Sequence, residues 1–88
     1  DIDVGEFVLV NLNSTIGHDA SLGDWTSLSA QCDITGHVRV ADRVFMGSRA
    51  SIIPEKSVGS RSIVGAGAVV VTHVPADVTV VGIPARIL

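Results

Sequence analysis

The stretch "STIGHDASLGDWTSLSAQCDITGHV", residues 14–38, places an aliphatic side chain at every sixth position. The same spacing runs from residue 4 to residue 70 without a break. The twelve positions are Val4, Val10, Ile16, Leu22, Leu28, Ile34, Val40, Met46, Ile52, Val58, Val64 and Val70. A period of six fits neither an α-helix, with about 3.6 residues per turn, nor a coiled coil, with about 3.5. The repeat therefore indicates a solenoid of short strands.

The residues beside each aliphatic position fit a triangular prism in which every side uses six residues. Glycine follows the aliphatic residue at six of the twelve places, where a tight turn leaves no room for a side chain or needs a positive φ. The residue four places after the aliphatic is small or β-branched, with Lys56 as the exception. The sequence thus predicts an all-β fold, a parallel β-helix of about four coils stacked about 4.8 Å apart.

Composition and charge exclude several classes of protein. With 47% hydrophobic residues and a net charge of −3, the chain is not disordered. Its apolar runs are too short for a membrane span, and no basic patch suggests nucleic acid as a partner. The lone Cys32 excludes a disulfide framework. We therefore expect no membrane or nucleic-acid partner, and a reducing, cytoplasmic location.

Residues 18 apart in the sequence should stack in columns along the prism. One column points inward and makes Cys32 a packing residue; its members are Ser14, Cys32, Ala50 and Ala68. Two columns point outward and carry large apolar side chains; their members are Phe7, Trp25, Arg43 and Arg61, and Leu9, Ser27, Phe45 and Ile63. Apolar side chains on an outer wall predict a subunit interface. Because the repeat is already in phase at Val4, with no cap before it, we also expect this chain to be the later part of a longer protein.

The hexad repeat and the ending "GAGAVVVTHVPADVTVVGIPARIL", residues 65–88, resemble the hexapeptide-repeat, left-handed β-helix family of acyltransferases. The segment from Val81 to Ala85 matches a Val-Gly-x-Pro-Ala signature of that family. The resemblance implies a left-handed β-helix over residues 1–72, followed by a turn and a closing strand over residues 73–88. It also implies a homotrimer of parallel prisms.

His18 is the strongest candidate for a catalytic residue. It follows the inward Ile16 by two positions, so its side chain points outward, and Gly36 holds the same column one coil later. An imidazole and an unobstructed backbone N–H about 4.8 Å apart suit acyl transfer, which needs a base and an oxyanion donor. The adjacent Asp19 either orients the imidazole or is a solvated turn residue.

The stretches "LNSTIGHDASLGD" (residues 12–24) and "DITGHV" (residues 33–38) are most similar to bacterial sugar acetyltransferases. These are the sialic acid O-acetyltransferase type and the N-acetyltransferases of nucleotide-linked amino sugars. The resemblance implies that His18 is the general base, Asp19 its partner and Gly36 the oxyanion donor. It implies acetyl-CoA as co-substrate in a groove between two prisms, and a sugar-nucleotide-binding domain upstream. The residues implied to contact the cofactor are Gly36, Gly65, Ala66, Gly82, Pro84 and Arg86.

A zinc site is the first rival interpretation, because γ-class carbonic anhydrases use the same prism. His37 and His73 fall in one column with Asp19 and Glu55. Two coils separate the histidines by about 9.6 Å, too far to share a zinc ion bound at about 2.0–2.1 Å. We therefore expect no metal, and interpret these four residues as a mixed-charge ladder of turn residues.

Two further alternatives stay open. A non-catalytic β-helix scaffold would show the same repeat, and a serine acetyltransferase has the same fold with another acceptor. Enzymes of this fold that acetylate galactosides interrupt the repeat with a long loop. The phase of this repeat never slips between Val4 and Val70, which disfavours that group.

Overall fold

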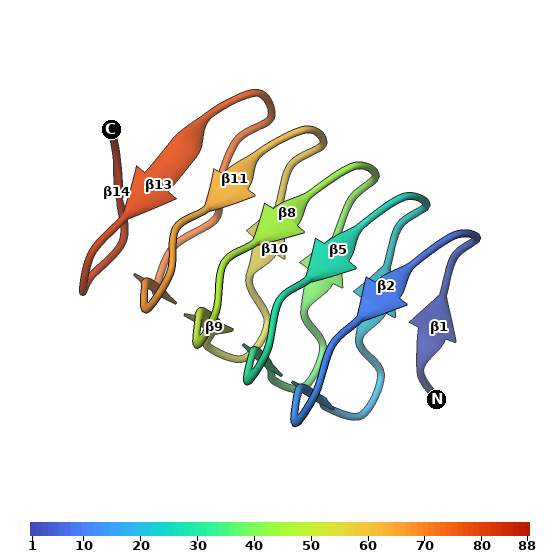
Figure 1. Ribbon diagram of the computed structural model, residues 1–88. Coiled ribbons are helices and arrows are strands. Elements are labelled where there is room, and N and C mark those ends of the chain that lie inside the picture. The colour runs from blue at the N-terminus through green and yellow to red at the C-terminus, as the bar shows by residue number, and fades with distance from the viewer.

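Each of the first twelve strands is two residues long and ends on an aliphatic residue of the hexad repeat. The computed structural model describes residues 1–88, which form fourteen strands and no helix (Figure 1). The chain winds as a left-handed parallel β-helix of about four turns, which confirms the fold predicted from the sequence. No helix long and apolar enough to cross a membrane is present.

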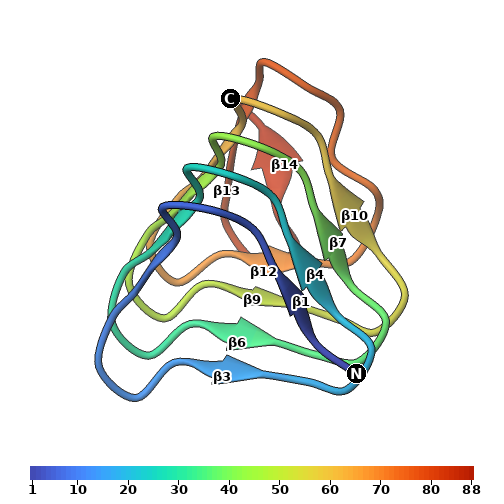
Figure 2. The same ribbon diagram turned by 90° about the vertical axis from the view of Figure 1, so that its right-hand side faces the viewer.

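The strands are stacked in three sheets, which form the faces of the prism. Sheet A contains β1 (Asp3–Val4), β4 (Ser21–Leu22), β7 (Arg39–Val40) and β10 (Ser57–Val58). Sheet B contains β2 (Leu9–Val10), β5 (Ser27–Leu28), β8 (Phe45–Met46), β11 (Ile63–Val64), β13 (Thr79–Val81) and the antiparallel β14 (Arg86–Ile87). Sheet C contains β3 (Thr15–Ile16), β6 (Asp33–Ile34), β9 (Ser51–Ile52) and β12 (Val69–Val70). Figure 2 shows sheets A and C as two separate stacked faces.

The register between coils is constant until the last one. Leu22 pairs with Val40 and Val40 with Val58, so that residues 18 apart in the sequence lie side by side. In the last coil the offset falls to 16, and Val58 pairs with Val74. The chain thus omits two residues at the corner after β12, and every later column differs from the one that a strict repeat predicts.

The core is a single stack of aliphatic side chains inside the prism. Leu28, Ile34, Met46, Ile52 and Val64 are completely buried. The predicted inward column of small residues packs beside them, and the buried Cys32 thiol donates a hydrogen bond to the Gly47 carbonyl at 3.2 Å. Burial raises the pKa of this thiol, as expected of a packing residue.

The corners correct one detail of the sequence interpretation. Positive φ angles recur every six residues, at the third residue after each aliphatic residue from Val4 to Val64. The glycines that directly follow the aliphatic residues do not adopt them. Ten of these residues are not glycine; they include Phe7 (57°), Trp25 (62°) and Arg61 (61°). After the two-residue omission, Asp77 adopts the same conformation (61°). The glycines serve close approach instead, since a Cβ at Gly47 would lie 2.6 Å from the backbone nitrogen of Ala66.

The outward column that begins at Phe7 carries stacked side chains. The rings of Phe7 and Trp25 stack with their centroids 4.5 Å apart, and the Arg43 guanidinium lies 5.8 Å from the Trp25 ring centroid. One coil later, Arg61 forms a two-point hydrogen bond with Asp77, at 2.6 and 2.9 Å. The prediction that these side chains point outward is confirmed, and the subunit interface stays a prediction.

The Arg61–Asp77 pair predicts a local pH dependence of the last coil. Hydrogen bonds from Arg61 hold the pKa of Asp77 below its ordinary value of 3.8. Because this pKa is lowered on folding, the pair stabilises the last coil above the unfolded-state pKa, and the stabilisation is lost as the pH falls through the folded-state value. Arg61→Ala should raise the pKa of Asp77 towards 3.8, as followed by NMR titration of its carboxyl carbon. Arg43→Ala, one coil earlier, should leave that pKa unchanged, and an equal rise in both variants would contradict the prediction.

Candidate active site

Four residues from two successive coils meet at the corner between sheet C and sheet A. His18 and Asp19 lie between β3 and β4, and Gly36 and His37 lie one coil later, between β6 and β7. The His37 amide donates a hydrogen bond to the His18 carbonyl oxygen at 3.0 Å, which ties the two corners together. The structure therefore places all three predicted catalytic residues at one exposed corner of the prism.

The His18 imidazole lies between a carboxylate and a backbone segment. Its Nδ1 is 3.2 Å from Asp19 Oδ2. Its Nε2 faces Gly36, where a Cβ atom would lie only 3.1 Å from that nitrogen. A carboxylate beside Nδ1 favours the tautomer that carries its proton on Nδ1, which leaves the lone pair on Nε2. The nitrogen able to accept a proton is thus the one that faces Gly36.

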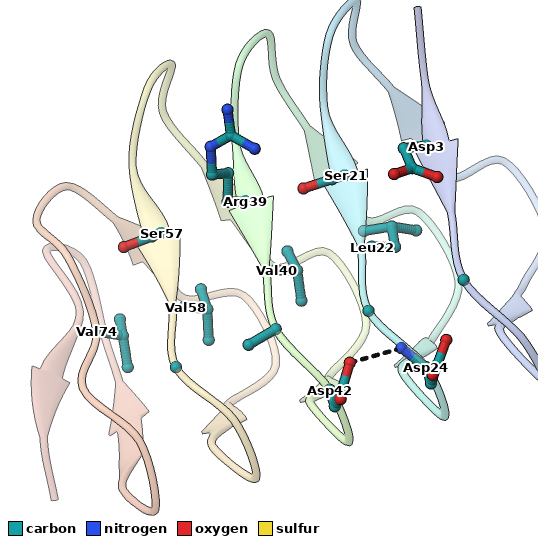
Figure 3. Close-up of a pocket in the computed structure, with 14 residues that line it drawn as sticks. Asp3, Ser21, Leu22, Asp24, Arg39, Val40, Asp42, Ser57, Val58 and Val74 are labelled. Atoms are coloured by element: carbon teal, nitrogen blue, oxygen red, sulfur yellow. Dashed lines mark hydrogen bonds between the residues drawn. The ribbon is translucent and has the colours of Figure 1, made fainter.

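The Gly36 amide donates no hydrogen bond within the chain. At the corner between sheets A and B, the equivalent amides of Glu6 and Asp24 each donate at 2.8 Å to an aspartate one coil later, Asp24 and Asp42 respectively. Figure 3 shows the Asp24–Asp42 bond at the edge of sheet A. Pro54 holds the corresponding place above Gly36 and has no side-chain acceptor. The Gly36 N–H is therefore free to donate to another molecule.

Gly17 is a site residue that sequence reasoning did not single out. A Cβ atom there would lie 2.6 Å from the Gly36 nitrogen and 2.7 Å from the Thr35 carbonyl carbon. Glycine at position 17 thus keeps the approach to the Gly36 amide uncovered. The sequence signal was present but not specific, because half of the repeats carry glycine at this place.

Asp19 supplies the negative charge of the site. Its pKa is lowered below the ordinary value of 3.8; the largest cause is a hydrogen bond from the amino group of Asp1, which is charged only in a chain that begins there, and the next is the hydrogen bond to His18. The ammonium nitrogen contacts Asp19 Oδ1 at 2.9 Å, and the other oxygen, Oδ2, faces His18. A carboxylate that is ionised at neutral pH stabilises an imidazolium beside it, as a general base requires once it has accepted a proton.

His37 is a second histidine of the site that the column analysis did not connect with His18. The two rings meet edge to face with centroids 4.9 Å apart, and His37 Nε2 lies 3.9 Å from Asp19 Oδ2. The pairing is diagonal, because His37 stacks on Asp19 and not on His18. The sequence analysis compared residues within one column, and it therefore weighed His37 against His73.

His73 does not belong to the ladder that the sequence predicted. The two-residue omission in the last coil moves it away from Glu55 and beside Ser57, whose amide and hydroxyl lie 3.1 and 2.9 Å from His73 Nδ1. The predicted column of Asp19, His37, Glu55 and His73 is thus wrong at its last member, and only the contact between Asp19 and His37 is formed at the site.

Comparisons with known proteins agree with the fold, although no family model matches the sequence. A serine acetyltransferase of Buchnera aphidicola is 37% identical over 99% of this chain. WeeI of Acinetobacter baumannii superimposes on the whole chain with a TM-score of 0.97 and 38% identity. A histidine-to-alanine mutant of GDP-perosamine N-acetyltransferase from Caulobacter crescentus, in complex with CoA and GDP-perosamine, superimposes on 99% of this chain with a TM-score of 0.76 and 28% identity.

The chain belongs to the hexapeptide-repeat acetyltransferase family. It spans only part of these family members, namely 31% of the serine acetyltransferase, 44% of WeeI and 50% of the perosamine enzyme.

The residues that the family resemblance assigned to acetyl-CoA lie at different edges of the prism. Gly65 and Ala66 lie between β11 and β12, at the corner of sheets B and C, whereas Gly36 lies at the corner of sheets C and A. Gly82 and Pro84 follow β13, and the Gly82 carbonyl accepts a hydrogen bond from the Val69 amide at 3.1 Å. No cavity of the chain is lined by all six residues, and their role stays a prediction.

The surface of the chain has two concave features, of which only one includes a predicted cofactor residue. Arg86, together with Thr72 and His73, lines a cavity of about 290 Å³ at the C-terminal end of the prism. A groove of about 710 Å³ runs along sheet A, where Ser21, Arg39 and Ser57 lie along its wall (Figure 3). The groove contains none of the predicted site residues.

The contact between Asp19 and His18 Nδ1 predicts the tautomer of the His18 ring. The wild-type ring should carry its proton on Nδ1 when neutral, and Asp19→Asn should shift it towards the Nε2–H form, because the charged acceptor is lost. Long-range ¹H–¹⁵N NMR of the histidine rings distinguishes the two forms. The His73 ring serves as internal control, and an unchanged His18 spectrum in Asp19→Asn would contradict the prediction.

Proposed function

We propose that the protein transfers an acetyl group from acetyl-CoA to an amino or hydroxyl group of a sugar, in particular a nucleotide-linked sugar. The observation that carries the proposal is the juxtaposition of two groups at one exposed corner. His18 Nε2 faces Gly36, and the Gly36 N–H has no acceptor within the chain. A proton acceptor and a backbone donor side by side are what attack on a thioester carbonyl requires.

In the proposed reaction, His18 Nε2 accepts the proton of the attacking amine or hydroxyl as it bonds to the thioester carbonyl carbon. Negative charge then develops on the carbonyl oxygen, and the Gly36 N–H donates a hydrogen bond to it. Asp19 holds the ring through Nδ1 and stabilises the imidazolium. When the tetrahedral intermediate collapses, the C–S bond breaks and the His18 imidazolium returns the proton to the leaving thiolate of CoA.

The proposed cofactor residues fit an assembly better than a single chain. Gly65 and Ala66 lie at a different corner from Gly36, so one acetyl-CoA molecule would meet both sets only across two neighbouring prisms. We therefore include a homotrimer in the proposal, with Gly82, Pro84 and Arg86 near the cofactor at the C-terminal end. The exposed apolar residues of sheet B, Leu9, Phe45 and Ile63, support burial between subunits. A cytoplasmic location, where acetyl-CoA is available, completes the proposal.

The proposed base predicts a specific loss in the protein's acetyl transfer. His18→Ala should lower kcat by about 10²–10⁴-fold, the usual contribution of a general base. Acetyl-CoA binding, followed by calorimetry, and the oligomer mass should stay as in the wild type, because the His18 side chain is 75% exposed and lies outside the buried core. Retention of more than about a tenth of the wild-type rate would contradict the assignment.

Serine is the second candidate acceptor, because a serine acetyltransferase is 37% identical to this chain. The two acceptors differ strongly in size and charge, so a direct competition separates them. With acetyl-CoA fixed, we expect GDP-perosamine to be acetylated with a kcat/KM at least tenfold above that of L-serine. The reverse order would assign the protein to serine acetylation while leaving the role of His18 unchanged.

A further inference from the structure

The corner that carries His18 also brings together three side chains of the kind that bind transition metals. One ligand atom from each of His18, Asp19 and His37 can be chosen so that all three lie within 4.8 Å of one another. His18 Nδ1 is 3.2 Å and His37 Nε2 is 3.9 Å from the same oxygen, Asp19 Oδ2. Ligand atoms around a tetrahedral ion with bonds of about 2.0–2.1 Å lie about 3.3 Å apart. The His18–Asp19 edge already has about that length, and the Asp19–His37 edge of 3.9 Å needs to shorten by about 0.6 Å. The ligand atoms of the two histidines lie within 4.8 Å of each other and need to close by at most about 1.5 Å.

The backbone holds these ligands while the side chains keep the freedom to adjust. Asp19 and His37 occupy equivalent corner positions in adjacent coils, with φ angles of 57° and 59°. The His37 amide is bonded to the His18 carbonyl, so the three Cα atoms belong to one rigid corner. The side chains of His18, Asp19 and His37 are 75%, 49% and 53% exposed, so none of them is fixed in the core and each has room for a small rotation.

The charge of the cluster also suits a cation. Asp19 contributes a carboxylate and the two histidines contribute imidazole nitrogens, a donor set that suits a divalent transition-metal ion. Both imidazoles contact the same carboxylate oxygen, Asp19 Oδ2, at 3.2 Å from His18 Nδ1 and 3.9 Å from His37 Nε2. Oδ2 therefore remains directed at the histidines.

We propose that His18, Asp19 and His37 form a site for a divalent transition-metal ion of the Zn²⁺ type, with His18 Nδ1, Asp19 Oδ2 and His37 Nε2 as ligands. Two imidazoles and one carboxylate suit Zn²⁺, Co²⁺, Ni²⁺ or Cu²⁺, whereas Mg²⁺ and Ca²⁺ prefer oxygen ligands alone. Three protein ligands leave a position for water.

Such an ion turns off the base, a consequence that rests on the proposed function. A neutral imidazole carries one proton and one lone pair on its two nitrogens. When the Nδ1 lone pair binds the metal, the ring proton moves from Nδ1 to Nε2, and the ring neither gains nor loses a proton overall. The Nε2 atom that faces Gly36 is then a donor and no longer accepts the proton of an attacking amine or hydroxyl. Zn²⁺ is thus an inhibitor of acetyl transfer, not its cofactor.

Calorimetric titration of the metal-free protein with ZnCl₂ tests the site directly. We expect one Zn²⁺ per chain, and no heat of binding with MgCl₂. His37→Ala should weaken the binding at least tenfold, because it removes one of three ligands. His73→Ala is the matched control: His73 is an exposed histidine bound to Ser57 outside the cluster, so its loss should leave the affinity unchanged. Absence of binding, or equal loss in both variants, would overturn the proposal.

Two further readouts separate this proposal from the proposed function. Long-range ¹H–¹⁵N NMR with Zn²⁺ should show the metal on His18 Nδ1 and the proton on Nε2; a metal on Nε2 would overturn the mechanism of inhibition. In the acetyl-transfer assay, Zn²⁺ should inhibit the wild type. The His37→Ala variant, measured against its own metal-free rate, should need an at least tenfold higher Zn²⁺ concentration for the same fractional inhibition. Equal inhibition of both proteins would overturn the link to the cluster. A protein that binds Zn²⁺ as expected but transfers no acetyl group would contradict the proposed function and leave the metal site supported.

Discussion

Backbone hydrogen bonding between coils in a fixed register is the constraint on which the rest of this molecule depends. Because each residue lies beside the residue 18 places further on, a choice at one position limits the choice in the next coil. Gly23 has no Cβ because the Asp42 carboxylate occupies that space, and Gly17 has none because the Gly36 amide lies there. The same backbone geometry occurs at two corners. At the corner of sheets A and B, the Asp42 carboxylate accepts a hydrogen bond from the Asp24 amide. At the corner of sheets C and A, the Gly36 amide beside His18 has no acceptor within the chain.

The period of six was enough to predict the sheets, the inward column and the register of the first four coils, because a buried aliphatic residue fixes the phase of each strand. It could not predict the last coil. After Val70 the strict series ends, and nothing in the local pattern indicates that two residues are omitted before Val74 pairs with Val58. The displacement of His73 to Ser57 follows from that omission alone. The positive φ angles at non-glycine residues such as Arg61 were also invisible, since hydrogen bonds between coils impose them against local preference.

The candidate site was predictable where it follows a column and not where it crosses one. His18 and Gly36 are 18 residues apart, so their contact could be deduced from the repeat. The contact between the His18 and His37 rings spans 19 residues and depends on how far two neighbouring side chains diverge at a corner. That divergence depends on side-chain torsions, which the hydrophobic pattern does not encode. The Gly36 amide is likewise open because Pro54, one coil later, has no side-chain acceptor. Asp42 provides such an acceptor for the Asp24 amide.

One ring nitrogen, Nδ1 of His18, connects the proposed catalysis with the proposed metal site at this corner. A base at Nε2 needs the proton on Nδ1, and Asp19 holds it there by accepting a hydrogen bond at 3.2 Å. That arrangement also directs Nδ1 and a carboxylate oxygen at the same small region of space, where His37 supplies a third ligand. Proton and metal therefore compete for one lone pair, and neither arrangement can be strengthened through Asp19 without strengthening the other. His37 is the member of the cluster that the proposed metal site requires and the proposed base does not, so the identity of this residue decides whether the proposed role of His18 depends on free metal.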